Sequence, residues 1–232
     1  MASINFIGGE KGGVGKSVLS RVLAQYHIDK EKPFVGFDTD RSHSSFIRFY
    51  SDYAHPTVVD SYESLDAIAN AVEQKPDQNV IVDLAAQTFA PVARWISDSN
   101  FFEAFSELNA AVNFWHVMDD GKDSVDLLGR LFDTYGRAAN YVIVLNYGRG
   151  NDFSIFKRSA EHQRAIDMGA TIIELPRLHD ACMRKIDQQN TSFWAAANNR
   201  AAGADALGIL ERQRVKAWLR NAYETLLPTP LA

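Results

Sequence analysis

The chain has 232 residues, of which 46% are hydrophobic and 23% charged, and its formal net charge is −5 at pH 7. This composition excludes wholesale disorder, and the acidic balance is not that of a protein built as an extended basic surface for nucleic acid. A single cysteine, Cys182, excludes an intrachain disulfide framework, a CxxC zinc site and a four-cysteine cluster within one subunit. Neither a secretory signal nor a run of 18 apolar residues is found. We expect one domain over residues 1–232, in the cytoplasm and away from membranes.

Short apolar runs alternate along the chain with longer amphipathic stretches. The runs VIVD at 80–83 and YVIVLN at 141–146 lack the alternation of a half-buried strand. Strands buried on both faces have this character, as in a parallel sheet covered by helices. We expect strands at residues 3–8, 33–38, 57–60, 79–83, 111–117, 141–146 and 171–174.

The stretches between these runs place apolar residues at helical spacing. Strands that alternate with helices predict a doubly wound α/β fold, in which helices cover both faces of a mostly parallel sheet in three layers. In residues 43–53 the aromatic side chains fall on roughly one helical face. We expect helices at residues 16–30, 43–53, 62–73, 90–108, 124–135, 153–168 and, as a long terminal helix, about 205–227.

The strongest motif is GGEKGGVGKS, residues 8–17, between the first strand and the first helix. Glycines let backbone N–H groups approach a phosphate, and the N-terminus of the following helix favours an anion. Lys16 can reach the β- and γ-phosphates of a nucleotide, and the Ser17 hydroxyl can ligate Mg²⁺. Glu10 stands where the standard P-loop spacing requires glycine, so the loop is a variant with an additional lysine, Lys11. The alternative is a glycine-rich turn that only connects strand and helix. The expected nucleotide contacts are Gly12, Gly13, Val14, Gly15, Lys16, Ser17 and Val18.

KGGVGKS resembles the deviant Walker A motif of the ParA/MinD ATPases, which belong to the SIMIBI class of P-loop NTPases. The resemblance implies a P-loop NTPase fold with ATP and Mg²⁺ as ligands. It implies that Lys11 reaches across an ATP-dependent homodimer into the partner subunit's site, and that Lys16 holds the phosphates of its own site. The alternative for Lys11 is an ordinary solvated lysine.

GFDTDRS, residues 36–42, resembles the DxD segment of that family. The resemblance implies that Asp40 is catalytic and positions or activates the attacking water, and that Asp38 supports the Mg²⁺ shell. The alternative is that both aspartates only cap the next helix. The strand ending in Asp83 resembles the Walker B strand, which implies that this carboxylate holds Mg²⁺. The family usually continues with a proline-containing stretch, whereas DLAAQT follows here. This departure puts the coupling of hydrolysis to dimer opening in doubt.

Asn146, at the end of YVIVLN, resembles the adenine-contacting residue of the family, since an amide can pair with a purine edge. LPRL, residues 175–178, resembles the loop that lies over the base and places Pro176 there. Both features favour ATP over GTP. The alternative for Asn146 is a turn residue at a strand end. The resemblance extends from residue 4 to about residue 196.

Residues 24–40 and 87–131 look like the plasmid conjugation and mobilisation ATPases of the TraL/MobD type. The implied function is a slow, Mg²⁺-dependent ATPase, stimulated by a protein partner. It would act as an ATP-dependent dimerisation switch in plasmid or DNA partition, intracellular positioning or conjugative transfer. The alternative is a small-molecule kinase or ATP-dependent synthetase on the same fold. A relative that holds ATP without hydrolysing it is disfavoured by the presence of Asp40.

The predicted terminal helix carries basic residues that would suit non-specific DNA through counterion release. Acidic residues share the helix, so the preferred interpretation is the charged face of an ordinary surface helix. Docking on its own sheet explains the apolar residues of this helix better than membrane binding does. The basic residues are Arg212, Arg214, Lys216 and Arg220, and the acidic ones are Glu211 and Glu224.

Overall fold

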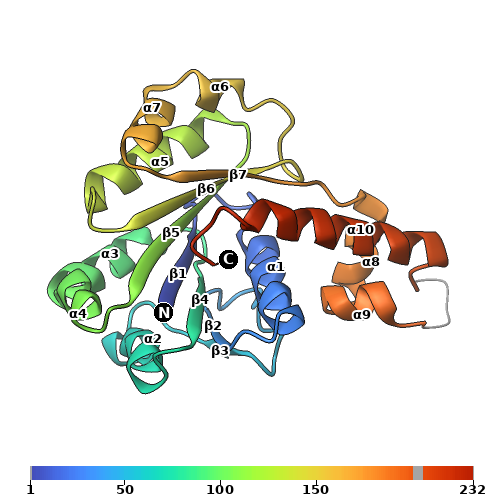
Figure 1. Ribbon diagram of the computed structural model, residues 1–232, viewed down its shortest axis with the longest axis horizontal. Coiled ribbons are helices and arrows are strands. Elements are labelled where there is room, and N and C mark those ends of the chain that lie inside the picture. Colours follow the sequence, from blue (N-terminus) through green and yellow to red (C-terminus); the bar gives the residue numbers. More distant parts are fainter. Residues whose placement is uncertain (1, 201–205, 232) are drawn as a thin grey trace.

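The computed structural model describes residues 2–200 and 206–231, and its centre is a single β-sheet (Figure 1). The strands are β1 (Ser3–Gly8), β2 (Phe34–Asp38), β3 (Ala54–Pro56), β4 (Asn79–Asp83), β5 (Ala111–Met118), β6 (Asn140–Asn146) and β7 (Thr171–Leu175). Their order across the sheet is β3-β2-β4-β1-β5-β6-β7, and every neighbouring pair is parallel. This arrangement confirms the predicted doubly wound α/β fold.

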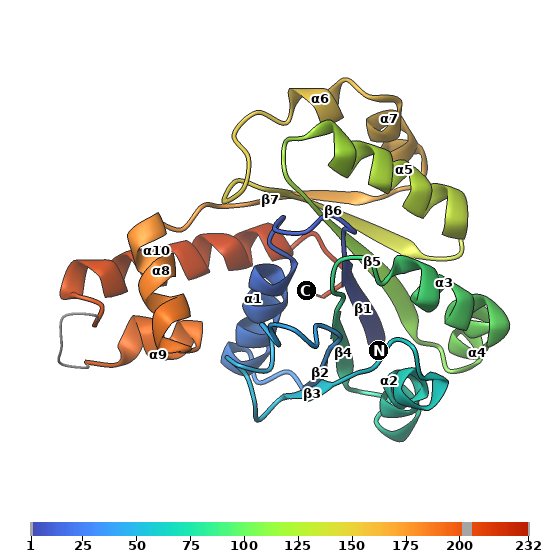
Figure 2. The same ribbon diagram turned by 180° about the vertical axis from the view of Figure 1, so that it is seen from behind.

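Helices lie on both sides of this sheet, as Figures 1 and 2 show from opposite directions. The helices are α1 (Lys16–Asp29), α2 (Tyr62–Gln74), α3 (Phe89–Asp98), α4 (Phe101–Glu107), α5 (Lys122–Tyr135), α6 (Ser154–Lys157), α7 (Ala160–Asp167), α8 (Asp180–Gln189), α9 (Phe193–Asn198) and α10 (Ile209–Leu226). Helices α1, α8, α9 and α10 contribute to one hydrophobic core, and α2 to α7 contribute to the other.

The central strands supply both cores at once. In β4, Ile81 belongs to the core under α1 and α10, whereas Val80 and Val82 belong to the opposite core. All three side chains are 0% exposed. Burying such a side chain contributes about 1.5–3 kcal/mol. A polar residue on either face would lose this stabilisation, which explains why the sequences of these strands are uninterrupted apolar runs.

The register of the sheet brings the two predicted acidic motifs together. Asp38 at the end of β2 and Ile7 near the end of β1 both pair with Asp83 at the end of β4. The two carboxylates therefore lie at one edge of the sheet, next to the loop that follows β1. Ligands bind at this carboxyl edge in open α/β sheets.

Residues 43–53 do not form the predicted helix but a series of turns. Oδ2 of Asp38 accepts the backbone N–H groups of Phe46 at 2.9 Å and Ile47 at 3.1 Å, and Ser44 has a left-handed φ of 44°. These local bonds replace a continuous helical ladder. The adjacent edge strand is Ala54–Pro56, so the predicted strand at 57–60 was also misplaced.

Two predicted helices are each divided into two shorter ones. Residues 90–108 break at Asn100, which has a left-handed φ of 46°, and residues 153–168 break where Ser159 caps α7. The terminal helix begins at Ile209 and ends at Leu226, and Asp205 of its predicted span lies outside the described residues. Helices α8 and α9 were not predicted. Across residues 2–200 and 206–231, no helix combines the length and the apolar character needed to cross a membrane.

Candidate nucleotide-binding site

The loop between β1 and α1 adopts a conformation that glycine makes accessible. Gly13 and Gly15 have φ angles of 79° and 99°, in the left-handed region. A Cβ on Gly15 would collide with the side-chain amide of Asn146, whereas a Cβ on Gly12 or Gly13 would meet nothing within 4 Å. The first half of the loop therefore opens onto free space, and its backbone N–H groups can be approached closely by a phosphate.

Lys16 is the first residue of α1 and lies where the partial positive charge of the helix N-terminus adds to its own. Its Nζ donates to the carbonyl oxygen of Lys11 at 3.1 Å, and the residue is 8% exposed. Burial lowers the pKa of this ammonium group. A buried cation with a single neutral acceptor is well prepared for an anion, since a phosphate would restore the solvation that burial removes.

Two adjoining cavities lie at this end of the sheet. The first has a volume of about 410 Å³ and is lined by Gly12, Gly13, Gly15, Lys16, Ser17, Val18, Arg21, Asp40, His43, Ser45, Arg48, Phe49, Asp83, Leu84, Ala85, Ala86, Arg149 and Asp187. The second, of about 290 Å³, shares Val18, Arg149 and Asp187 with it and also contacts Asn146 and Pro176. The fold thus gathers most of the predicted site residues. Lys11, Val14 and Asp38 line neither cavity.

Asp83 has a buried carboxylate with unsatisfied oxygens. It is 2% exposed, and neither carboxylate oxygen has a hydrogen-bond partner among the described residues. Burial raises its pKa to about 7, and the hydroxyls of Ser17 and Ser20 nearby act in the opposite direction. A buried carboxylate without partners is costly, and a hard divalent cation is the ligand that it prefers. Asp83 and Ser17 therefore fit Mg²⁺.

The two aspartates of the DxD segment have different surroundings. Asp38 is 3% exposed, and its oxygens accept three backbone N–H groups, from Asp40, Phe46 and Ile47. These contacts shape the turns that follow β2, so the observed role of Asp38 is structural, and its place in the Mg²⁺ shell stays a prediction. Asp40 lines the first cavity, and its Oδ1 accepts the N–H groups of Ser42 at 2.9 Å and His43 at 3.1 Å. These two hydrogen bonds orient the Asp40 carboxylate, which lines the cavity.

The amide of Asn146 is already occupied within the chain. Its Nδ2 donates to the carbonyl oxygen of Val14 at 2.7 Å, and its Oδ1 accepts the N–H of Gly148 at 2.9 Å. This arrangement matches the alternative of a strand-end residue, and it ties the end of β6 to the phosphate loop. Contact of Asn146 with adenine stays a prediction. Pro176 lies in the second cavity, where the predicted base loop requires it.

Lys11 is not a freely solvated lysine. Its Nζ lies 2.8 Å from Oδ2 of Asp119 and 3.8 Å from Oδ2 of Asp123. The hydrogen bond to Asp119 is the main reason that the pKa of Lys11 is raised. Within one chain, the Lys11 side chain therefore points towards the start of α5.

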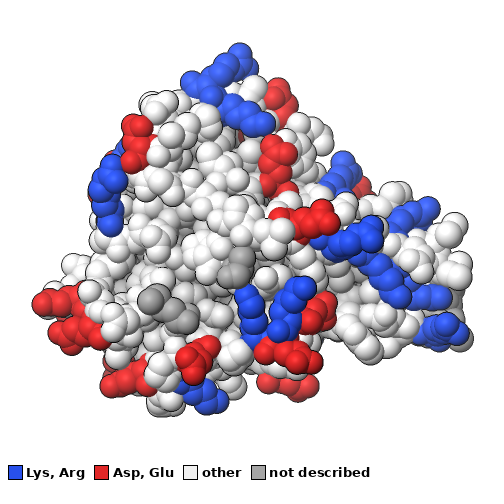
Figure 3. Space-filling view, viewed as in Figure 1, with Lys and Arg blue, Asp and Glu red and all other residues white. Residues whose placement is uncertain are grey.

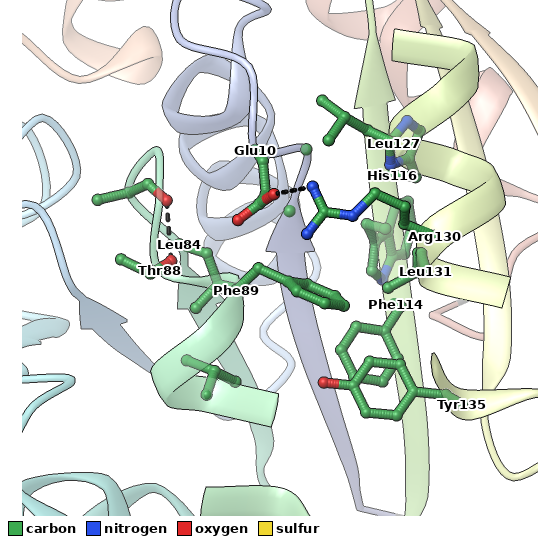
Figure 4. A pocket seen from close by; sticks show the side chains of 15 residues that line it. Glu10, Leu84, Thr88, Phe89, Phe114, His116, Leu127, Arg130, Leu131 and Tyr135 are labelled. Carbon is green, nitrogen blue, oxygen red and sulfur yellow. Dashed lines mark hydrogen bonds and ion pairs between the residues drawn. The ribbon is translucent and has the colours of Figure 1, made fainter. Parts of the chain in front are cut away.

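Glu10, the residue that departs from the standard P-loop spacing, has a defined partner. Its carboxylate lies 3.1 Å from the Arg130 guanidinium of α5, and Figure 4 shows the two groups facing each other above an apolar pocket. Arg130 also lies over the ring of Phe89, at 5.7 Å from its centroid, where α3 begins. Through Arg130, Glu10 thus connects the phosphate loop with α5 and with the segment after Asp83.

Three site residues were not singled out from the sequence. Arg149 lines both cavities, and Arg21 lines the first, where its guanidinium lies between the rings of Phe49 and Phe193. Thr39 ties the loop after β4 in place, because its Oγ1 donates to the carbonyl oxygen of Asp83 and accepts the N–H of Ala85. Of these three, only Arg149 had a signal in the sequence. It follows the strand that ends in Asn146, and loops at that edge of a parallel sheet contact ligands.

Known proteins resemble this chain in sequence and in fold. No protein-family model matches the chain. Protein TraL of Escherichia coli is 24% identical over 246 residues, covering 97% of this chain and 98% of TraL. Protein MobD of Acidithiobacillus ferrooxidans is 22% identical over 227 residues, covering 97% and 96%.

Among solved structures, the MinD cell division protein of Aquifex aeolicus has a TM-score of 0.52 and 13% identity, covering 96% of this chain and 97% of MinD. A chain of the MinC:MinD complex from that organism has a TM-score of 0.54 and 13% identity, covering 98% of each chain. These solved structures share the fold of this chain. The TraL and MobD proteins are similar to it in sequence over nearly its whole length.

Proposed function

We propose that the protein is a Mg²⁺-dependent ATPase that acts as an ATP-dependent dimerisation switch in plasmid transfer or partition. One observation carries the proposal. Lys16, Asp40 and Asp83 line one cavity beside an open phosphate loop, and the Asp83 carboxylate has no hydrogen-bond partner among the described residues. The relationship to TraL and MobD supports a role in plasmid transfer, and the likeness to MinD supports the fold on which the switch would operate.

The residues of this chain divide the chemistry among them. The backbone N–H groups of residues 12–15 and the ammonium of Lys16 would bind the phosphates. Asp83 and Ser17 would hold Mg²⁺, which supplies positive charge against the charge on the γ-phosphate. Asp40 would orient the attacking water, because its carboxylate is fixed by two backbone N–H groups and its side chain is 27% exposed. Lys11 would enter the partner subunit's site in the closed dimer.

The switch itself follows from differential binding. A nucleotide shifts an equilibrium between monomer and dimer only if it contacts the two states differently. Lys11 supplies such a difference in this proposal, because it is bound to Asp119 in the single chain and would bind phosphate in the dimer. A protein partner that recognises the dimer would stimulate slow hydrolysis and return the chains to monomers.

The nucleotide site is tested by titration calorimetry with Mg-ATP. We expect wild-type protein to bind, and Lys16→Ala to bind at least about 100-fold more weakly, because a desolvated phosphate contact is lost. Lys75→Ala, on the exposed surface next to α2, is the matched control and should bind as wild type does. Absence of binding to wild-type protein, or equal binding by the Lys16→Ala variant, would contradict the proposal.

A further inference from the structure

A larger hollow lies at the other end of α1 from the phosphate loop. It has a volume of about 840 Å³ and lies between α1, α9 and α10. We call it the α10 groove. Its apolar and aromatic lining consists of Tyr26, Trp194, Ala197, Leu219, Tyr223 and Leu227.

Two large apolar side chains in the α10 groove are unusually exposed. Trp194 is 52% exposed and Leu227 is 64% exposed. Tryptophan is among the residue types that most often dominate a protein interface, because burying it removes a large apolar area from water. The groove therefore offers the apolar half of a docking site.

The charges around the α10 groove indicate the character of its occupant. Lys30, Lys216 and Arg220 line it, and their side chains have no hydrogen bond or ion pair with any residue in the described part of the chain. The carboxylate of Asp29, in contrast, is engaged by Gln25 and by the Tyr223 hydroxyl, each at 2.8 Å. Figure 3 shows Lys and Arg side chains gathered on the part of the surface where α9 and α10 lie. Glu224 also lines the groove and is exposed, so the three uncommitted cations leave an excess of positive charge, which favours an acidic occupant.

The apolar lining favours a peptide over a nucleic-acid duplex. A phosphate backbone binds cations at a polar surface and gains nothing from an apolar floor. An amphipathic helix uses both parts, because it lays apolar residues into the groove and keeps acidic residues at the rim. The α10 groove matches an acidic amphipathic helix.

The α10 groove also backs directly onto the nucleotide site. Trp194 and Leu219 follow Phe193 and Trp218, whose rings pack with centroids 4.9 Å apart. Phe193 lies against Arg21 of the first cavity, and Trp218 Nε1 donates to the carbonyl oxygen of Pro176 at 2.7 Å. A helix bound in the groove would therefore lie next to Phe193 and Trp218, which contact Arg21 and the base loop.

We propose that the α10 groove binds an acidic amphipathic helix of a protein partner, with Trp194 as its apolar anchor and Lys216 and Arg220 as its charge contacts. Only the effect of that partner on ATP hydrolysis rests on the proposed function. Binding itself requires no nucleotide.

The test uses displayed random 16-residue peptides, selected on the wild-type protein without nucleotide and then measured by fluorescence anisotropy. We expect the selected peptides to combine Leu, Phe or Trp at i, i+3 or i+4, and i+7 with Glu or Asp between them. Binding should weaken at least about tenfold in Lys216→Glu/Arg220→Glu and in Trp194→Ala. The control Lys75→Glu/Arg94→Glu reverses two exposed charges, one directly after α2 and one on α3, and should leave binding unchanged.

Three results would overturn the inference. They are a selection without groove-dependent peptides, peptides without acidic enrichment, or equal binding to wild type and to Lys216→Glu/Arg220→Glu. A labelled DNA duplex that loses affinity in Lys216→Glu/Arg220→Glu, while no peptide does, would assign the surface to DNA instead. ATP binding measured on the same proteins is independent, so its loss with intact peptide binding would contradict the proposed function alone.

Discussion

Lys11 and Asp119 form an ion pair within one chain, with 2.8 Å between Nζ and Oδ2. Asp119 lies just before α5, and its Oδ1 also accepts the N–H of Gly121 and the hydroxyl of Ser124. In the proposed dimer Lys11 must leave this partner before it can enter the other subunit's site. In the proposed switch, this ion pair would therefore oppose dimerisation.

Asp119→Asn removes the charge that holds Lys11 and keeps the side-chain oxygen that accepts from Gly121 and Ser124. A partly exposed ion pair is worth up to about 1 kcal/mol, and the proposed dimer would break one in each subunit, so their loss should tighten ATP-dependent dimerisation by up to roughly 30-fold. Sedimentation velocity at several protein concentrations measures the change. Dimerisation that is unchanged or weaker in Asp119→Asn, with native stability, would show that this ion pair does not restrain Lys11.

Asn146→Ala separates positioning of the phosphate loop from recognition of the base. Its amide is used by Val14 and Gly148, so we expect affinities for ATP and GTP to fall by the same factor, about tenfold. Competition binding with both nucleotides measures the two affinities. A change in the ratio of ATP to GTP affinity would instead establish that Asn146 contacts adenine.

Arg149→Ala tests a residue that the structure adds to the site. The side chain is exposed, lines both cavities and has no ion pair with a described residue. Since an arginine contributes charge-assisted hydrogen bonds to phosphate, we expect about tenfold weaker ATP binding with an unchanged melting temperature. Arg149→Lys should recover part of the loss. Wild-type affinity in Arg149→Ala would remove this residue from the site.

Because His116 is buried, we expect the free energy of unfolding to fall in mild acid. This residue is 3% exposed, its Nε2 lies 2.8 Å from the carbonyl oxygen of Ser124, and burial lowers its pKa to about 4. The folded pKa lies below the unfolded value of about 6.5, so this contribution is complete above pH 6.5 and is lost as the pH falls towards 4.

Between pH 8 and pH 5 the His116 contribution amounts to about 2 kcal/mol of unfolding free energy. Urea denaturation at both pH values should show a smaller difference in His116→Gln than in wild type. The exposed His179→Gln serves as control and should retain the wild-type difference. An equal difference in His116→Gln and wild type would rule out His116 as its source.

The sequence predicted the sheet and the phosphate loop because their signals are local. Ile81 and its neighbours are apolar on both sides of the strand, and a glycine loop followed by Lys16 and Ser17 has few other uses. The order of strands in the sheet was not predictable in the same way, since it depends on crossovers between distant segments. The same holds for the pairing of Glu10 with Arg130, which lie 120 residues apart.

The errors have local physical causes that competed with helical spacing. Residues 43–53 have the aromatic pattern of a helix, but the Asp38 carboxylate takes the N–H groups of Phe46 and Ile47. Asn100 ends one helix in a left-handed conformation that asparagine tolerates. Helix α9 spans only Phe193–Asn198, and a segment of that length has too little periodicity to stand out.

In the proposed switch, ATP closes two copies of this chain into a dimer. Light scattering on Asp40→Ala with Mg-ATP and with Mg-ADP tests it most directly, because blocked hydrolysis should trap the ATP state. We predict a mass close to twice 25.9 kDa with Mg-ATP and a monomer with Mg-ADP. A monomer in both nucleotides, with ATP binding confirmed by calorimetry, would contradict the switch and favour a small-molecule kinase or synthetase.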